Sequence, residues 1–243
     1  MLFNSAEFLI FFPIVIALFF AIPHRYRWVL LLAASYYFYI AWKAEYVVLI
    51  IISTLVDYFA GRQMAKIDDR ARRKKYLILS LGIHLNILFA FKYFNFFNSS
   101  LRAVFIGLDL AYPIPAFQAL LPVGISFYTF KSLSYIIDIY RGVKQPETHL
   151  GIFALYVSFF PQLIAGPIDR SERMIPQLKR VQGWDWGRTG EGLRRMAWGF
   201  FKKLVIADRL AVLVNTVYDA PGDFTGMPLI LATYFYAFQI YCD

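Results

Sequence analysis

Two charged side chains lie inside an otherwise apolar stretch, residues 117–140, where they could do chemistry. Lys131 and Asp138 are seven residues apart, so a helix would place them on one face, about two turns from each other. A charge near the centre of a bilayer costs at least a few kcal/mol unless it is paired or hydrated. We expect each to meet another helix or water, and Asp138 could also pair with Arg141. A structural ion pair is the alternative to a functional role.

A second candidate is the break in residues 159–170, which read FFPQLIAGPIDR. Pro161 removes a helix donor and Gln162 brings an amide into apolar surroundings. Gly166 followed by Pro167 forces extended backbone. Such backbone is tolerated at membrane depth only where protein or a water-filled cavity surrounds it. The pattern predicts either a plain helix end or a cavity wall, with Arg170 at its edge.

For other polar residues in apolar stretches, the sequence predicts a role less specifically. His84 and Asn86 could join helices by hydrogen bonds or act in a proton relay or as ligands. Asp57 and Arg62 lie on either side of Gly61, which predicts a helix terminus with solvated charges.

Motifs of common enzyme classes do not occur. There is no Walker A loop, no G-x-S-x-G elbow and no H-E-x-x-H pair. The three histidines, His24, His84 and His149, have no metal-ligand spacing, and the single cysteine, Cys242, cannot form an internal disulfide. The sequence predicts no metal site and no complete catalytic site in these 243 residues.

The composition places these residues in a membrane. The chain is 59% hydrophobic and 17% charged, against about 45–50% and about 25% in an ordinary soluble domain. We predict an all-α polytopic membrane protein, a bundle of transmembrane helices in which residues 1–243 form a single membrane-embedded domain. The apolar stretches suggest six to eight membrane elements: residues 8–22, 28–42, 46–60, 76–97, 117–140, 152–165, 196–217 and 229–242.

Basic loops set the expected orientation. Lys and Arg number 25 against 16 Asp and Glu, an excess that suits cytoplasmic loops facing anionic lipid rather than nucleic acid. Residues 62–75 are strongly basic, so we place them in the cytoplasm together with a turn at residues 24–27. Alternation then puts a loop at residues 98–116 outside and residues 141–149 inside.

Two stretches do not fit simple alternation. Residues 166–195 are also basic, yet residues 152–165 would span only about 21 Å as a helix, against a hydrocarbon core of about 30 Å. We therefore predict a re-entrant or interfacial segment over residues 152–167. Lys202 and Lys203 suggest that the stretch beginning at residue 196 starts near the cytoplasmic interface. The last stretch ends without a closing loop, so we expect a chain truncated at its C-terminal end.

Four blocks of sequence, in order, resemble the membrane-bound O-acyltransferase family, in its alginate O-acetyltransferase branch. They are LPVGISFYTFKSLSYIIDIYRG at residues 121–142, FFPQLIAGPIDR at 159–170, GFFKKLVIADRLA at 199–211 and YFYAFQIYCD at 234–243. The opening MLFNSAEFLIFFPIV also resembles the start of that branch.

The resemblance implies a multi-pass protein of the bacterial inner membrane whose helices surround a funnel. The family's essential histidine would lie beyond Asp243, so none of the three histidines here is assigned to catalysis and this portion would be inactive alone. The funnel-wall candidates are then Lys131, Asp138, Gln162, Gly166, Pro167 and Arg170. No cofactor is expected to be bound.

The resemblance also implies the reaction and its partners. An acyl donor such as acetyl-CoA would approach from the cytoplasm, and the acetyl group would pass across the membrane to an exported polysaccharide, alginate, with periplasmic acetyltransferase partners and membrane lipid in contact. The alternatives are D-alanyl transfer to teichoic acid within the same family and, from another class, a transporter or flippase, whose sites also lie at broken helices.

Overall fold

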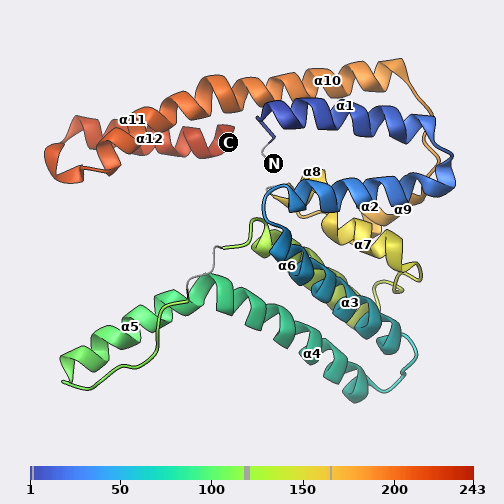
Figure 1. The fold of residues 1–243 in the computed structure, drawn as a ribbon, viewed down its shortest axis with the longest axis horizontal. Coiled ribbons are helices and arrows are strands. Elements are labelled where there is room, and N and C mark those ends of the chain that lie inside the picture. Colours follow the sequence, from blue (N-terminus) through green and yellow to red (C-terminus); the bar gives the residue numbers. More distant parts are fainter. Residues whose placement is uncertain (2, 118–120, 165) are drawn as a thin grey trace. The chain divides into compact units, whose positions relative to one another are not determined.

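The computed structural model describes residues 1, 3–117, 121–164 and 166–243, and its regular elements there are all helical (Figure 1). The chain divides into two compact units, Met1–Gln182 and Gly183–Asp243. That residues 1–243 form one membrane-embedded domain stays a prediction. In the described part, two helices are long and apolar enough to cross a bilayer, Ala44–Met64 and Arg70–Gly107.

The first unit opens with two helices, α1 (Ala6–Ala21) and α2 (His24–Ile40). The Ser5 side chain accepts a hydrogen bond from the backbone N–H of Phe8 and so caps α1. The turn predicted at residues 24–27 is wrong, because the chain reverses one step earlier, at Pro23, and His24 already belongs to α2. Pro is suited to this place because it needs no backbone N–H partner there.

The next helices form a long pair. A 3-10 turn, η1 (Ala44–Tyr46), leads into α3 (Val47–Met64), and a short loop leads into α4 (Arg70–Leu88). α4 runs on through a π-helical turn, η2 (Phe89–Tyr93), into α5 (Phe94–Gly107). The loop predicted at residues 98–116 is therefore wrong in its first ten residues, where the apolar and small side chains continue the helix.

α6 (Ile125–Arg141) begins later than the apolar stretch at residues 117–140 suggested. Gly124, with φ of +76°, precedes the helix, and residues 118–120 lie outside the described part. At the other end, Gly142 has φ of +78° and closes the helix, since its N–H bonds to the Ile139 carbonyl and the next N–H bonds to the Asp138 carbonyl.

The segment predicted to be re-entrant is a series of short helices. α7 (Leu150–Ser158) has nine residues, about 13 Å of helix, and α8 (Phe160–Leu163) follows a break at Phe159. Ala165, the end of the predicted stretch, lies outside the described residues. α9 (Ser171–Lys179) comes next. Neither α7 nor α8 is long enough to cross a bilayer.

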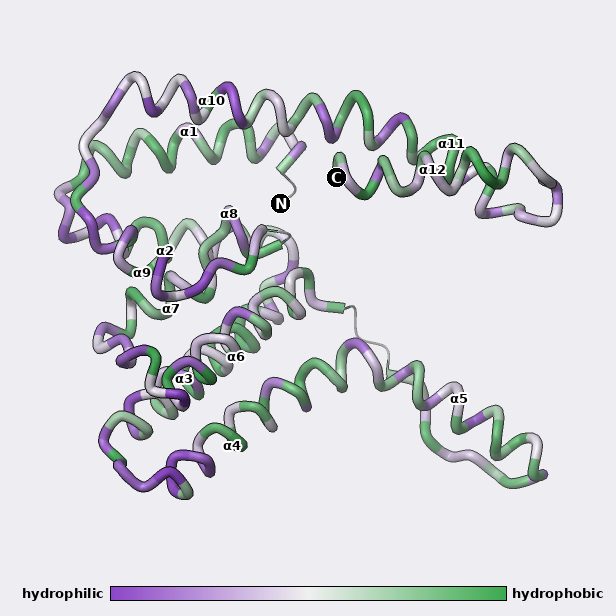
Figure 2. The backbone as a smooth tube through the Cα atoms, turned by 180° about the vertical axis from the view of Figure 1, so that it is seen from behind, coloured by the Kyte–Doolittle hydropathy of each residue, from purple (hydrophilic) through white to green (hydrophobic). Residues whose placement is uncertain are grey.

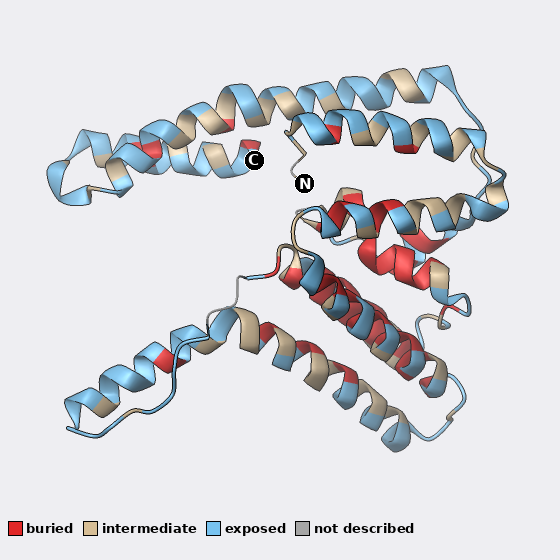
Figure 3. Cartoon of the chain, viewed as in Figure 1, coloured by how far each residue is buried: buried red, intermediate tan, exposed pale blue. Residues whose placement is uncertain are grey.

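The core of the first unit lies where α3, α4, α6 and α7 pack together, and Figure 3 shows buried residues concentrated on α3, α6 and α7. α7 is enclosed by protein, with Phe153, Leu155 and Tyr156 fully buried. α1 and the second half of α4 expose large apolar side chains, and Figure 2 shows hydrophobic residues along both, whereas α4 begins with basic residues. An enclosed short helix among helices with apolar outer surfaces fits a membrane protein.

The second unit consists of α10 (Trp186–Phe200), a π-helical segment η3 (Phe201–Ala207), α11 (Asp208–Tyr218), a 3-10 turn η4 (Pro221–Asp223) and α12 (Met227–Cys242). α10, η3 and α11 follow one another without a break. α12 folds back on α11, and the Tyr218 hydroxyl bonds to the Thr233 hydroxyl at 3.2 Å. Lys203 pairs with Asp208 and with Asp243, which ties the end of α12 to η3.

Candidate functional site

Lys131 is the buried centre of a polar network in the first unit. Its side chain, on α6, is only 5% exposed. The amine donates to Gln162 Oε1 at 2.9 Å and to the Met174 sulfur at 3.4 Å, and it lies 4.5 Å from the centre of the Tyr156 ring. The expectation that Lys131 meets another helix is confirmed, because these partners come from α7, α8 and α9.

Gln162 connects this amine to a carboxylate. Its Nε2 donates to Asp169 Oδ2 at 2.9 Å, so one amide bonds to Lys131 on one side and Asp169 on the other. The Tyr156 hydroxyl donates to the Asp169 carbonyl at 3.1 Å. We call Lys131, Tyr156, Gln162 and Asp169 the Lys131 network. Asp169 was not among the residues predicted from the sequence, although it stands three residues after Gly166 in the same broken segment.

Two glycines allow the backbone to close around the network. A Cβ on Gly166 would collide with Gln162 Cα, and the Gly166 N–H bonds to the Gln162 carbonyl at 3.2 Å. A Cβ on Gly124 would collide with the Leu163 carbonyl, where α6 begins against α8. The break is therefore a site where backbone packs on backbone, which a plain helix end would not require.

The network borders a small cavity of about 10 Å³, room for roughly one water molecule. Gln162, Gly166 and Pro167 line it together with Lys131. Two of the six predicted wall residues lie apart from it. Asp138 is half-buried near the end of α6, with no ion pair to Arg141 in the described part, and Arg170 is exposed just before α9.

A second buried cluster lies between α3 and α4. Asp57, Ser80 and His84 are each at most 1% exposed. The Ser80 hydroxyl donates to Asp57 Oδ1 at 2.5 Å, and His84 Nε2 lies 2.8 Å from Asp57 Oδ2. We call these three residues the Asp57 cluster. It is not a nucleophile arrangement, because Ser80 bonds to the carboxylate and not to the imidazole.

The prediction that Asp57 lies at a solvated helix terminus is wrong. α3 continues to Met64, so Asp57 is inside the helix and faces α4. Of the two readings of His84, the hydrogen bond between helices is the one that the structure contains. Asn86 differs, since it is exposed and bonds to the Gly82 carbonyl of its own helix at 2.7 Å.

Basic side chains gather at one end of the first unit. Arg73 donates to the Ile139 carbonyl at 2.6 Å, and Arg62 donates to the Thr148 carbonyl at 3.2 Å. His24 Nε2 bonds to the Lys179 carbonyl at 3.1 Å. These contacts bring the start of α2, the α3–α4 and α6–α7 loops and the end of α9 together. The stretches expected in the cytoplasm therefore meet at the same end.

An ion pair anchors this end. Lys179 lies 2.7 Å from Glu147 Oε2, and the backbone N–H groups of Thr148 and His149 each donate to Glu147 Oε1 at 3.0 Å. Burial alone would raise the pKa of Glu147, but the Lys179 ammonium and the two N–H groups hold that pKa below its ordinary value. A hollow of about 580 Å³ lies beside this ion pair. Its charged lining residues are the pair itself together with Lys144, Arg180 and Glu172.

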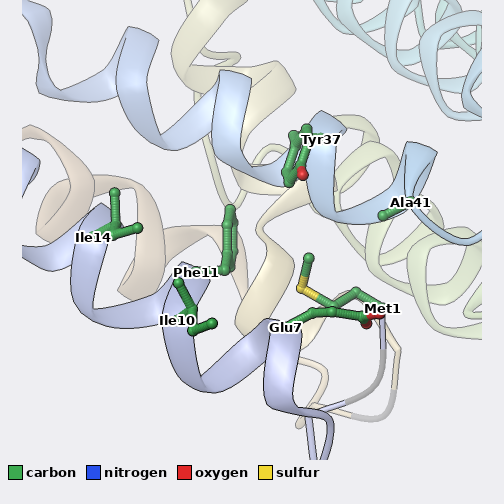
Figure 4. Close-up of a pocket in the computed structure, with 7 residues that line it drawn as sticks. All are labelled: Met1, Glu7, Ile10, Phe11, Ile14, Tyr37 and Ala41. Carbon is green, nitrogen blue, oxygen red and sulfur yellow. The ribbon is translucent and has the colours of Figure 1, made fainter.

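Another groove lies between α1 and α2, far from Glu147 and Lys179 in the sequence. It measures about 500 Å³ and is lined mostly by apolar side chains, with Phe11 and Tyr37 facing it from the two helices and Glu7 at one end (Figure 4). Its lining holds no group of acid, base and nucleophile. In the described residues, no cluster of three or more His, Cys, Asp or Glu is placed to hold a metal ion.

Comparison with known proteins finds relatives along the whole chain. A probable alginate O-acetylase AlgI of Pseudomonas putida is 39% identical over 246 residues, 100% of this chain and 50% of that protein. A peptidoglycan O-acetyltransferase of Helicobacter pylori is 29% identical over 239 residues, 88% of this chain and 44% of that protein. A teichoic acid D-alanyltransferase of Streptococcus thermophilus is 27% identical over 127 residues, 50% of this chain and 30% of that protein. No family model matches the chain.

These relatives confirm the resemblance found in the four sequence blocks, and the chain belongs to the membrane-bound O-acyltransferase family. Within that family, the relatives that match this chain from end to end are alginate O-acetylases, whereas the D-alanyltransferase matches only half of this chain. The chain spans about half the length of the curated relatives it matches. The family and the apolar helices together make this a membrane protein.

Proposed function

We propose that the whole protein transfers acetyl groups to an exported polysaccharide, alginate. The observation that carries this proposal is the 39% identity to an alginate O-acetylase over 100% of the chain. D-alanyl transfer to teichoic acid is less well supported, because the relative with that name is 27% identical over 50% of the chain.

The protein would be a multi-pass protein of the bacterial inner membrane, with its basic loops in the cytoplasm. The meeting of Arg62, Arg73 and His24 with their partners at one end supports this topology. α7 and α8 would form a re-entrant segment that enters from the cytoplasmic end and does not cross, since α7 has only nine residues.

In this scheme the Lys131 network belongs to the wall of a funnel completed by the rest of the protein. Its polar groups, placed at a break in the backbone and enclosed by helices, suit a surface bordering a water-filled passage. Lys131, Gln162, Gly166 and Pro167 line the small cavity there, which supports their place in the wall. Asp138 and Arg170 would lie nearer the cytoplasmic end.

The acyl donor would be a thioester such as acetyl-CoA, used as a substrate. The acceptor hydroxyl oxygen attacks the thioester carbonyl carbon, a C–O bond forms and the C–S bond breaks. The hydroxyl proton passes to a base and the thiolate leaves. The family histidine beyond Asp243 would be that base or a positioning group, and periplasmic acetyltransferase partners would carry the acetyl group to the polysaccharide.

Restoring acetylation in cells tests this function. The full-length gene is expressed in an alginate-producing bacterium that lacks its own alginate O-acetylase, and the acetyl content of the secreted alginate is measured. We expect acetyl esters to return. Secreted alginate without acetyl esters, with the protein present in the inner membrane, would overturn the proposal.

Donor recognition is tested separately. Arg170 and Arg173 are exposed at the start of α9 and would attract the donor phosphates. We expect the double variant R170E/R173E of the full-length protein to bind acetyl-CoA about tenfold more weakly. Unchanged affinity would remove these two residues from the donor site.

A further inference from the structure

The helix α10 has two distinct sides. Trp186, Leu193 and Phe200 are spaced seven residues apart, so they lie along one side of the helix. Arg188 and Arg195 have the same spacing but lie on the opposite side. A helix with this division presents one apolar and one charged surface along its whole length.

The apolar side is largely uncovered within the second unit, where Trp186 meets the ring of Trp184 edge-on at 5.1 Å and Phe200 is half-buried. No residue of α10 is buried, and Trp186 and Leu193 are 80% and 58% exposed. In this unit α10 touches chiefly η3, which continues it, and Figure 3 shows α10 as mainly exposed. A row of large apolar side chains in water is unfavourable, so a further surface must cover it.

The amino-acid composition of α10 also indicates that this helix needs a surface to pack against. Four glycines, Gly187, Gly190, Gly192 and Gly199, each disfavour an isolated helix by about 1 kcal/mol relative to alanine. At the last three of these positions an added Cβ would meet nothing within 4 Å in the described structure. They serve no close packing in this unit, so α10 depends on what it lies against.

The charged side of α10 indicates what kind of surface the helix packs against. Residues 184–203 contain five Lys or Arg and two Asp or Glu. Arg188 pairs with Asp185, Arg195 with Glu191, and Lys203 with acids outside this stretch. Arg194 and Lys202 then remain as the excess of positive charge. Tryptophan and arginine on one helix are typical of the membrane interface, where the ring meets acyl chains and the cation meets phosphates.

We propose that α10 lies flat in the cytoplasmic headgroup layer of the membrane, with Trp186, Leu193 and Phe200 against acyl chains and Arg188, Arg194 and Arg195 at lipid phosphates. This inference depends on the topology proposed above. A spanning position is disfavoured because three arginines would enter the hydrocarbon core. α10 then acts as an interfacial anchor that leads, through η3, into the hairpin of α11 and α12.

Site-directed spin labelling of the full-length protein in lipid nanodiscs tests this placement. Single cysteines are introduced in a background without native cysteines, at the apolar side (L193C and F200C) and at the charged side (R188C and R195C). Collision rates of the label are measured with oxygen, which concentrates in lipid, and with a nickel chelate, which stays in water. L79C on α4 serves as the lipid control and D68C in the α3–α4 loop as the water control.

For the apolar side we expect oxygen collisions to exceed nickel collisions by about threefold, and we expect the reverse on the charged side. Low rates with both reagents at Leu193 and Phe200 would show that another part of the protein covers them, which overturns the proposal. High nickel rates on both sides would place α10 in water and would also overturn it. Alginate acetylation by each variant is measured in parallel, so a failure of this proposal is distinguishable from a failure of the proposed function.

Discussion

The Lys131 network and the Asp57 cluster both lie inside the first unit, but they are built in opposite ways, and only the cluster is fully buried. The network collects its groups from α6, α7, α8 and the chain before α9, where helices are short and the backbone is broken. The cluster collects its groups from two long, continuous helices, α3 and α4. Polar groups are therefore accommodated inside this unit in two ways: at a break in the backbone, or between two continuous helices that face each other.

The two arrangements differ in what they leave open. The network borders a small cavity and includes backbone groups, so it can exchange partners with water or with a ligand. The Asp57 carboxylate has both oxygens bonded to side chains that are buried with it. We infer that the cluster holds α3 to α4, while the network is the better candidate for contact with a substrate passage.

The largest effect is expected from removing the centre of the Asp57 cluster. D57A leaves Ser80 and His84 buried without their partner, which should destabilise the fold by about 3 to 5 kcal/mol. The thermal unfolding midpoint of the full-length protein in detergent measures this. D57N is the control, since it keeps the volume and one acceptor and should lose less. A D57A midpoint equal to that of the wild type would show that the cluster does not hold α3 to α4.

A smaller loss is expected at the break. G166A places a Cβ against the backbone of Gln162, which cannot move aside, so we expect a cost of about 2 to 3 kcal/mol. G82A on α4 is the matched control, because a Cβ there meets nothing within 4 Å. It should be neutral or slightly stabilising. If both variants unfold at the same temperature, the close approach at Gly166 does not matter to the fold.

Variants of Lys131 can distinguish a purely structural role of the network from a role in the substrate passage. K131M leaves Gln162 Oε1 without its donor, which should cost about 1 to 2 kcal/mol. K131M/Q162L removes both partners of that bond and should recover part of that stability. Recovery is incomplete because Asp169 Oδ2, which is half-buried, loses its bond from Gln162 Nε2 and takes water in its place. Alginate acetylation is measured alongside. We expect the double variant to stay defective in acetylation; recovery of activity together with stability would reduce the network to a structural contact.

The smallest effect concerns the Glu147–Lys179 pair at the exposed end. Because the pKa of Glu147 is lowered in the folded protein, the pair contributes stability above the ordinary pKa of 4.5 and loses it as the pH falls through the lowered value. E147Q should therefore weaken the acid dependence of the unfolding midpoint below about pH 4.5. An unchanged pH profile would mean that other carboxylates control acid unfolding. High salt should weaken this pair more than either buried cluster.

Local sequence predicted much of the fold. Runs of apolar residues located α1, α2, α3 and α12 to within a few residues, since a helix in lipid needs such a run. The run at residues 76–97 found α4 but missed its basic start and its continuation into α5. Pro161, Gly166 and Pro167 predicted the break that α7 and α8 show. The start of α6 and the extent of α5 were missed, because apolar residues continue across these boundaries. Pro122 and Gly124 were the local signals for the start of α6.

By itself the sequence determined that the chain is a membrane protein of the O-acyltransferase family, where its backbone is interrupted and which loops are basic. Only the tertiary structure decided which polar groups meet: Asp57 with His84, and Gln162 with both Lys131 and Asp169. The reason is physical. A run of residues sets the type of a helix, but the rotation and register of one helix against another depend on all the side chains packed between them.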